Sequence, residues 1–144
     1  MTIRAVIDTN VFVSAIIGDK QSAPRLIYEA FKDDLFTSVT SQAVIDEIEE
    51  VLDRLPIRAR FKLTDAQVKQ FVNDFITVSA IVPSDRYVSV SQLIDPKDNI
   101  FVTCAVVGSA DYIISGDTKH LLSLKEFEGI KIVSPRTFLD EVLG

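Results

Sequence analysis

The stretch IRAVIDTNVFVSAII, from Ile3 to Ile17, begins as an apolar run, stops at a polar triplet, and then becomes apolar again. Its first part, Ile3 to Ile7, is rich in β-branched residues and, apart from Arg4, has no polar face, which is typical of a strand buried on both sides. Such a strand needs helices over both faces of its sheet. The opening residues therefore predict an α/β fold.

Strand-like and helix-like patterns alternate along the rest of the chain. Further strands are predicted over Leu35 to Val39, Ala80 to Pro83, Tyr112 to Ser115 and Ile130 to Val133. Helices are predicted up to Ile17, from Ser22 to about Lys32 with Leu26, Ile27, Ala30 and Phe31 as its core face, from Ser41 to before Pro56, from Thr64 to about Ser79, from Asp98 or Asn99 to about Val107, and from Ser134 onward. This order predicts a three-layer α/β/α sandwich with a central, mostly parallel sheet, in which residues 1–144 form a single domain.

Composition restricts the class of protein further. The chain is 47% hydrophobic and 25% charged, as expected for a folded, soluble domain. No apolar run reaches the roughly 18–20 residues that span a bilayer, and no signal peptide is recognisable, so a membrane location is not expected. The single cysteine, Cys104, cannot form an internal disulfide, which favours a reducing compartment and predicts a cytoplasmic protein.

The formal net charge of −6 argues against a protein that coats nucleic acid without specificity. It does not exclude a nucleic-acid enzyme, because acids that converge on a divalent cation have their charge offset locally. The question is whether the acids converge.

Three aspartates are placed where the predicted strands end or their helices begin. Asp8 follows the first strand, Asp117 follows the strand YIIS, and Asp98 opens the helix that leads to that strand. In open parallel sheets, ligands bind at the carboxyl ends of the strands. All three carboxylates can therefore lie at one edge of the sheet.

A fourth acid is expected from the helix SQAVIDEIEEVLDRL. The apolar stripe of this helix consists of Val44, Ile45, Ile48, Val51, Leu52 and Leu55. Glu47 and Glu49 flank this stripe on opposite sides, and helix geometry alone leaves both as candidates for the rim of a pocket.

Carboxylates that gather in one pocket do not all stay ionised without a cation. Oxygen ligands suit Mg²⁺ or Mn²⁺, whereas zinc would prefer His and Cys, of which the chain has one each. Taken singly, each acid also has an ordinary structural interpretation. Asp8 and Asp117 could cap helices, Asp98 could be a turn residue, and Glu47 could belong to a solvated helix face.

Three segments, VIDTNVFVSA, SQAVIDEIEEVL and DPKDNIFVTCAVVGSADYIISGDTKHLL, carry a family resemblance. Over nearly its whole length the chain resembles the PIN-domain ribonucleases, and within that family it is most similar to toxins of toxin–antitoxin pairs. The resemblance implies metal-dependent cleavage of RNA, with an antitoxin protein as a partner.

The resemblance also assigns roles to single residues. It places the catalytic, metal-binding acids at Asp8, Glu47, Asp98 and Asp117, with Mg²⁺ or Mn²⁺ as the cofactor. It selects Glu47 over Glu49, because EIEEVL matches the glutamate motif of the family. Thr9, Asn10 and Ser115 are expected to contact the substrate or hold the ligands, and Asp111 is expected to be structural.

The segment RLPIRARFKLTDAQVKQFVNDF is longer than in the most compact PIN domains, so the resemblance assigns it no role. Within it, a basic connection brings four positive charges into ten residues without an acid, namely Arg54, Arg58, Arg60 and Lys62. These residues are candidates for contact with RNA phosphates or with an acidic antitoxin. A solvated loop is the alternative interpretation, and a homodimer stays open.

Two other kinds of function compete with the nuclease. A phosphatase or phosphotransferase with an aspartyl nucleophile also begins with an apolar strand, but here Asn10 stands two residues after Asp8 and no lysine follows a later strand as required. Serine or cysteine hydrolysis would depend on His120, the only histidine, and no phosphate-binding glycine loop is present. The alternative from another class is a non-catalytic PIN-fold module that binds RNA or protein.

Overall fold

A computed structural model of the chain describes residues 2–83, 88–93, 95–116 and 121–144. Its strands are β1 (Arg4–Ile7), β2 (Thr37–Ser41), β3 (Ala80–Val82), β4 (Tyr112–Ile114), β5 (Glu126–Phe127) and β6 (Ile130–Val133). Its helices are α1 (Thr9–Ile17), α2 (Ala23–Lys32), α3 (Gln42–Leu52), α4 (Leu55–Phe61), α5 (Asp65–Val78), α6 (Asn99–Val107), α7 (Leu121–Leu124) and α8 (Pro135–Thr137), together with a 3₁₀ turn η1 (Pro96–Asp98) and a π-helical segment η2 (Phe138–Val142).

The strands of the described residues form one sheet in the order β3-β2-β1-β4-β6-β5. All neighbouring pairs are parallel except β5 and β6, which pair antiparallel. Strand β1 lies in the interior of the sheet, where Val6 is opposite Val39 on one side and Ile113 on the other. Ala5, Val6 and Ile7 are buried, which explains why these positions are apolar on both faces of the strand, while the guanidinium of Arg4 at its start donates two hydrogen bonds to the carbonyl of Gly108.

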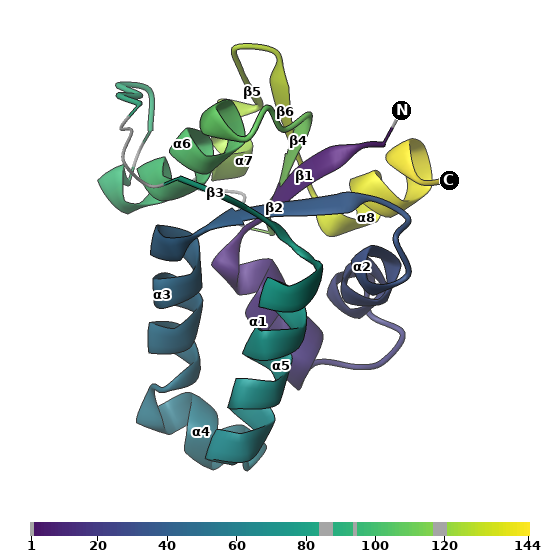
Figure 1. The fold of residues 1–144 in the computed structure, drawn as a ribbon, viewed down its shortest axis with the longest axis vertical. Coiled ribbons are helices and arrows are strands. Elements are labelled where there is room, and N and C mark those ends of the chain that lie inside the picture. Colours follow the sequence, from purple (N-terminus) through teal and green to yellow (C-terminus); the bar gives the residue numbers. More distant parts are fainter. Residues whose placement is uncertain (1, 84–87, 94, 117–120) are drawn as a thin grey trace.

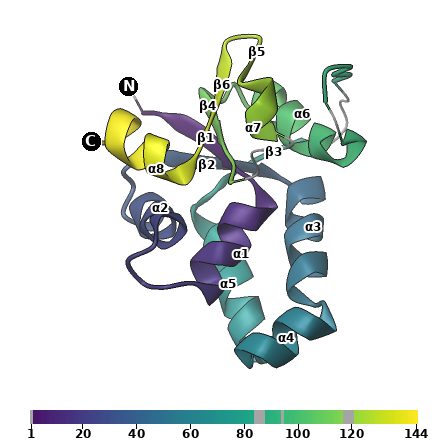
Figure 2. The same cartoon turned by 180° about the vertical axis from the view of Figure 1, so that it is seen from behind.

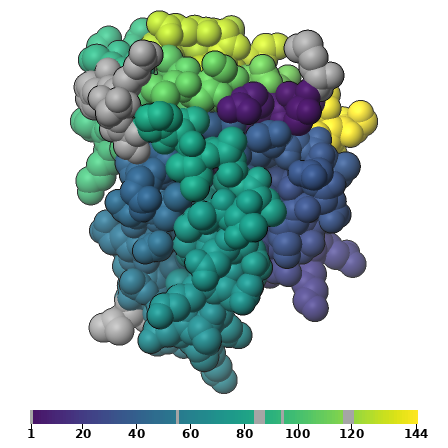
Figure 3. Space-filling view, viewed as in Figure 1, coloured from purple at the N-terminus to yellow at the C-terminus, as the bar shows by residue number. Residues whose placement is uncertain are grey.

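Helices cover both faces of the sheet. Helices α6 and α7 lie on one side, and α1, α2 and α5 lie on the other (Figures 1 and 2). The predicted three-layer α/β/α sandwich with a mostly parallel sheet is thus confirmed. Helices α3, α4 and α5 form an arm that extends away from the sheet, with α4 at its far end (Figures 1 and 3).

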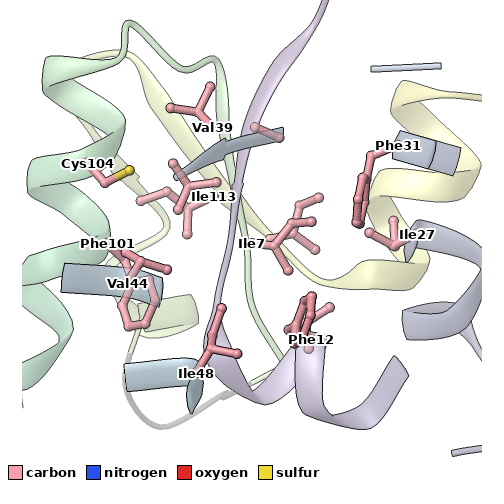
Figure 4. Packing of buried hydrophobic residues seen from close by; sticks show 14 of the residues in the cluster. Ile7, Phe12, Ile27, Phe31, Val39, Val44, Ile48, Phe101, Cys104 and Ile113 are labelled. Atoms are coloured by element: carbon pink, nitrogen blue, oxygen red, sulfur yellow. The ribbon is translucent and has the colours of Figure 1, made fainter. Parts of the chain in front are cut away.

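The core fills the space between the sheet and both helical layers (Figure 4). Fully buried residues reach into it from β1, α1, α2, α3 and α6, including Ile7, Phe12, Phe31, Ile48 and Phe101. Cys104 is buried in this core as a small apolar residue. Within the described part of the chain, no helix has both the length and the apolar character that crossing a bilayer requires.

Several helix boundaries follow from capping side chains that the sequence indicates. The hydroxyls of Ser22, Ser41 and Ser134 each accept a hydrogen bond from a backbone N–H in the first turn of α2, α3 and α8. Thr64 and Gln67 form a reciprocal capping box at the start of α5. These polar residues therefore set where the chain changes direction around the core.

The basic connection predicted between Arg54 and Leu63 is wrong as a description of the backbone, because this segment contains helix α4. Helix α3 already ends at Leu52, and Pro56 then occupies the first turn of α4, where its missing N–H costs no helical hydrogen bond. Lys62, in the left-handed conformation with φ of 52°, ends α4.

Three smaller expectations also need correction. Strand β2 starts at Thr37 and not at Leu35, because the N–H of Leu35 bonds to the carbonyl of Ala30 in the turn that ends α2. Leu26 is predicted to face the core from α2 but is 40% exposed, whereas Tyr28, which is not in the predicted core face, is buried. The two-residue strand β5 was not predicted, since so short an edge strand has no periodicity to detect.

Candidate active site

Asp8 lies at the point where β1 ends and α1 begins. Its N–H continues the pairing with β4 by donating to the carbonyl of Ile114 at 2.9 Å, and its own carbonyl accepts from the N–H groups of Val11 and Phe12. The side chain occupies the N-cap position of α1 but makes no capping hydrogen bond. Its carboxylate instead accepts a hydrogen bond of 2.7 Å from the hydroxyl of Ser115, which follows β4. A capping role therefore does not explain Asp8.

The Asp8 carboxylate is almost completely buried, with 6% of the residue exposed. Burial raises the pKa of Asp8 from 3.8 to about 6, and the hydrogen bond from Ser115 counteracts part of this rise. The negative charges of Asp98 and Glu47 raise the pKa further. Asp98 and Glu47 are therefore each close enough to Asp8 to repel its carboxylate, and a cation placed among them would relieve that repulsion.

Glu47 comes from α3, and the hydroxyl of Thr9 at the start of α1 donates a short hydrogen bond to its Oε2 atom. Glu47 and Asp8 line the same pocket. Glu49 lines a different pocket, together with Asp53 of the α3–α4 corner and Lys69 of α5. The structure thus separates the two glutamates that helix geometry left as equal candidates.

We call the pocket that contains the acids the α1–α3 groove. It has a volume of about 370 Å³, and it is lined by Asp8, Thr9, Asn10, Val13, Ser14, Glu47, Val51, Arg54, Asp98 and Phe101. Asp98 reaches it from the 3₁₀ turn that precedes α6. The groove lies beside the carboxyl ends of β1 and β4, where the sequence places Asp8 and Asp98.

The other predicted residues lie around these acids. Asn10 lines the groove, and its Oδ1 atom accepts a hydrogen bond of 3.4 Å from the N–H of Gly116. Asp117 and His120 lie outside the described residues, so the predicted fourth acid has no described position. Asp111 lies at the other end of the strands, where its carboxylate accepts from the N–H of Arg4 at 3.0 Å, as expected for a structural residue.

The donor chemistry of the groove fits a hard divalent cation. Asp8, Glu47 and Asp98 offer carboxylate oxygens, which Mg²⁺ and Mn²⁺ prefer, and no histidine or cysteine lines the described groove. Among the described residues, however, no three His, Cys, Asp or Glu side chains are arranged closely enough to form a complete metal site. We therefore treat the described acids as part of a ligand set.

The basic residues that the sequence groups together are separated by the structure. Arg54 lines the groove with the acids. Arg58 is held within the arm by hydrogen bonds to the carbonyl of Leu52 at 2.9 Å, to Asp65 at 2.8 Å and to Asp53. Arg58 therefore stabilises the corner where α3, α4 and α5 meet, and we assign it no RNA contact.

The two remaining basic residues of this set lie on the surface of the arm. The guanidinium of Arg60 lies over the ring of Phe61, 5.3 Å from its centroid. Lys62 is exposed at the end of α4. Neither lines the α1–α3 groove.

The residues that form the walls of the groove, Val13, Ser14 and Val51, were not predicted from the sequence as part of the site. Val13 and Ser14 follow Asn10 at helical spacings of three and four residues, so they lie on the same face of α1. Val51 and Arg54 follow Glu47 at spacings of four and seven on the opposite wall. These spacings are present in the sequence, but they indicate a groove only when it is known that α1 and α3 lie side by side.

The chain is an α/β sandwich with acids gathered beside the carboxyl ends of its parallel strands, and a comparison with protein families identifies the class to which it belongs. A family model described as a PIN domain matches residues 4–119. The chain therefore belongs to the PIN-domain family, whose members are generally nucleases.

The proteins that are similar to the chain include the following two. An uncharacterized protein from Methanocaldococcus jannaschii is 28% identical over 147 aligned residues, which cover 96% of this chain and 91% of the relative. The crystal structure of VapBC2 from Rickettsia felis bound to a DNA fragment from its promoter contains a chain of the same fold, with a TM-score of 0.59 and 14% identity over 92% of this chain and 98% of that one.

Proposed function

We propose that this protein is an endoribonuclease that requires Mg²⁺ or Mn²⁺ and hydrolyses RNA phosphodiester bonds in the α1–α3 groove. Asp8, Glu47, Asp98 and Asp117 are the proposed catalytic and metal-binding acids. The observation that carries the proposal is the state of Asp8, a buried carboxylate that caps no helix and is repelled by Asp98 and Glu47. A structural role would not explain why three acids share one pocket.

The chain's own residues orient the acids. The Ser115 hydroxyl fixes the Asp8 carboxylate, and the Thr9 hydroxyl fixes the Glu47 carboxylate, so that each acid keeps one direction before any ligand arrives. Asn10 ties the start of α1 to Gly116 at the end of β4. Of these contacts, the hydrogen bond between Thr9 and Glu47 joins the two walls of the groove, α1 and α3.

When bound, Mg²⁺ or Mn²⁺ would offset the carboxylate charge, polarise the phosphoryl group and increase the acidity of a water molecule. In the hydrolysis itself, the water oxygen forms a bond to phosphorus, the bond to the leaving ribose oxygen breaks, and a proton passes to that oxygen. Glu47, which is held by Thr9, would orient the water by accepting a hydrogen bond from it.

We further propose that the protein acts as the toxin of a toxin–antitoxin pair. The resemblance of its motifs to such toxins supports this role, and the VapBC2 structure provides a protein of the same fold within a two-component complex. The proposed partner is an antitoxin protein, and the proposed location is the cytoplasm.

The test is cleavage of a single-stranded RNA by the purified protein with Mg²⁺, with Mn²⁺ and with EDTA. Asp8→Asn, purified in parallel, controls for contaminating ribonucleases, because it keeps the acceptor for Ser115 but loses the charge. We expect cleavage only with metal and a loss of at least about a hundredfold in Asp8→Asn. Calorimetric titration with Mn²⁺ should show weaker binding to the variant.

Equal cleavage by both proteins would refute the assignment. Binding of RNA without cleavage by the wild-type protein would instead favour the non-catalytic PIN-fold module.

A further inference from the structure

The α1–α3 groove has a direction. Asp8 and Asp98 lie at its end beside the sheet, where β1 ends and α6 begins. From there α3 extends away from the sheet, with Glu47, Val51 and Arg54 lining one wall at successive helical spacings. Arg54 lies two residues beyond Leu52, the last residue of α3, which is itself about 7.5 Å along the helix axis from Glu47.

Charge changes sign along this groove. Its end beside the sheet carries three acids, Asp8, Glu47 and Asp98, whereas Arg54 carries the only positive charge among the described lining residues. On a chain of net charge −6, a lone arginine in the wall of an acidic groove is the natural contact for an anionic group of a ligand that occupies the acidic end.

The backbone of Arg54 is fixed by hydrogen bonds, while its side chain is free to turn from Glu50 to a ligand. Its N–H donates to Val51 at 3.2 Å, and its carbonyl accepts from the N–H groups of Ile57 and Arg58 at 3.1 Å. The side chain is 60% exposed, and its ion pair with the 74% exposed Glu50 is long, at 3.8 Å. Such a surface pair contributes little free energy, so a phosphate can replace Glu50 at small cost.

We propose that Arg54 binds a phosphate that neighbours the scissile one in a single RNA strand lying along the α1–α3 groove. The inference rests on the proposed function, which places the scissile phosphate at the acids. A guanidinium suits this task, because its fork of N–H donors matches the oxygens of a phosphate group. Arg54 would thus be a binding residue that makes the enzyme favour substrates with more than one phosphodiester.

The experiment compares two substrates and three variants. The substrates are a single-stranded oligoribonucleotide and a dinucleoside monophosphate, which has only one phosphodiester and so lacks the neighbouring phosphate. The variants are Arg54→Ala, Arg54→Lys and the matched control Arg60→Ala, which removes the same charge outside the groove. Thermal melts establish that each variant is folded.

For the oligoribonucleotide we expect Arg54→Ala to raise KM about tenfold or more and to change kcat little, since a charge-assisted contact is lost. The dependence of log KM on log salt should become shallower by roughly 0.7, the contribution of one phosphate contact in a single strand. Arg54→Lys should recover part of the loss, and Arg60→Ala should match the wild type. With the dinucleoside monophosphate, kcat/KM should be the same for all proteins.

Equal KM and equal salt dependence in Arg54→Ala and the wild type would overturn the inference. Arg54 would then be a candidate for contact with an acidic protein partner. An equal loss on both substrates would also overturn it, because Arg54 would then act on the scissile phosphate.

A separate readout distinguishes failure of this inference from failure of the proposed function. Fluorescence anisotropy of a labelled oligoribonucleotide is measured with Asp8→Asn and with the double variant Asp8→Asn, Arg54→Ala. Weaker binding by the double variant supports the Arg54 contact even if the wild-type protein cleaves no RNA. Equal binding refutes it.

Discussion

The hydroxyl of Ser115 donates a hydrogen bond of 2.7 Å to the carboxylate of Asp8, across 107 residues of sequence. Both residues are buried, at the ends of the adjacent parallel strands β1 and β4. The bond favours the ionised form of an acid whose burial disfavours it. Removal of either partner should therefore alter both the stability of the protein and the pH dependence of its chemistry.

Asp8→Asn should stabilise the metal-free protein at neutral pH. The pKa of Asp8 in the folded protein, about 6, lies above its ordinary value of 3.8, so the folded state binds this proton more tightly than the unfolded state. Protonated Asp8 therefore stabilises the folded state, and this contribution is complete below about pH 4 and is lost as the pH rises through 6. At pH 7 the neutral asparagine should therefore be more stable than aspartate by about 2–3 kcal/mol.

Urea unfolding in EDTA between pH 4 and pH 8 measures this difference. Glu49→Gln is the control, since it removes a charge from the same protein outside the α1–α3 groove. An Asp8→Asn protein that is less stable than the wild type at pH 7 would mean that the carboxylate is not repelled as described.

Ser115→Ala should raise the pKa of Asp8 further, because the hydrogen bond that opposes the effect of burial is lost. The acidic limb of the pH–rate profile for RNA cleavage should then move to higher pH, with a lower rate at neutral pH. Ser38→Ala is a suitable control, because Ser38 is also buried and bonds to Ser79 away from the groove. A pH profile that shifts equally in both variants would argue against the role of Ser115.

Glu47→Gln and Glu49→Gln should behave differently although both change the same helix. Glu47 lines the α1–α3 groove and accepts from Thr9, whereas Glu49 lines the pocket between α3 and α5. We expect Glu47→Gln to reduce kcat by about a hundredfold and Glu49→Gln to change it by less than about twofold. Single-turnover RNA cleavage compares the two variants, and the opposite order would contradict the proposed ligand set.

Arg58→Ala should lower the melting temperature without changing the KM for RNA below that temperature. Arg58 connects the end of α3 to the start of α5 through Leu52, Asp53 and Asp65, so its loss loosens the corner of the arm. Differential scanning calorimetry measures the shift, with Arg60→Ala as the control that should leave it unchanged. An unchanged melting temperature together with a higher KM would make Arg58 an RNA contact instead.

Much of this architecture is determined by the sequence itself. The apolar run from Ala5 to Ile7 favours a strand buried on both faces, and the capping residues Ser22, Ser41 and Thr64 mark where helices begin. Strand alternation and the position of Asp8 after the first strand also predict the edge of the sheet at which the acids lie. These inferences succeed because they depend on local periodicity and on the direction of parallel strands.

Only the tertiary structure decided which segments of the chain lie opposite each face of a helix. Periodicity places Glu47 and Glu49 on opposite flanks of one stripe, but which flank faces α1 depends on how α3 packs against α1 and α5. In the same way, Arg54 and Arg58 are alike in sequence, yet the corner between α3 and α4 turns one into the groove and the other into the arm. The reason is physical: local sequence sets the angle of a side chain about its own helix, whereas contacts between distant segments set what lies opposite it.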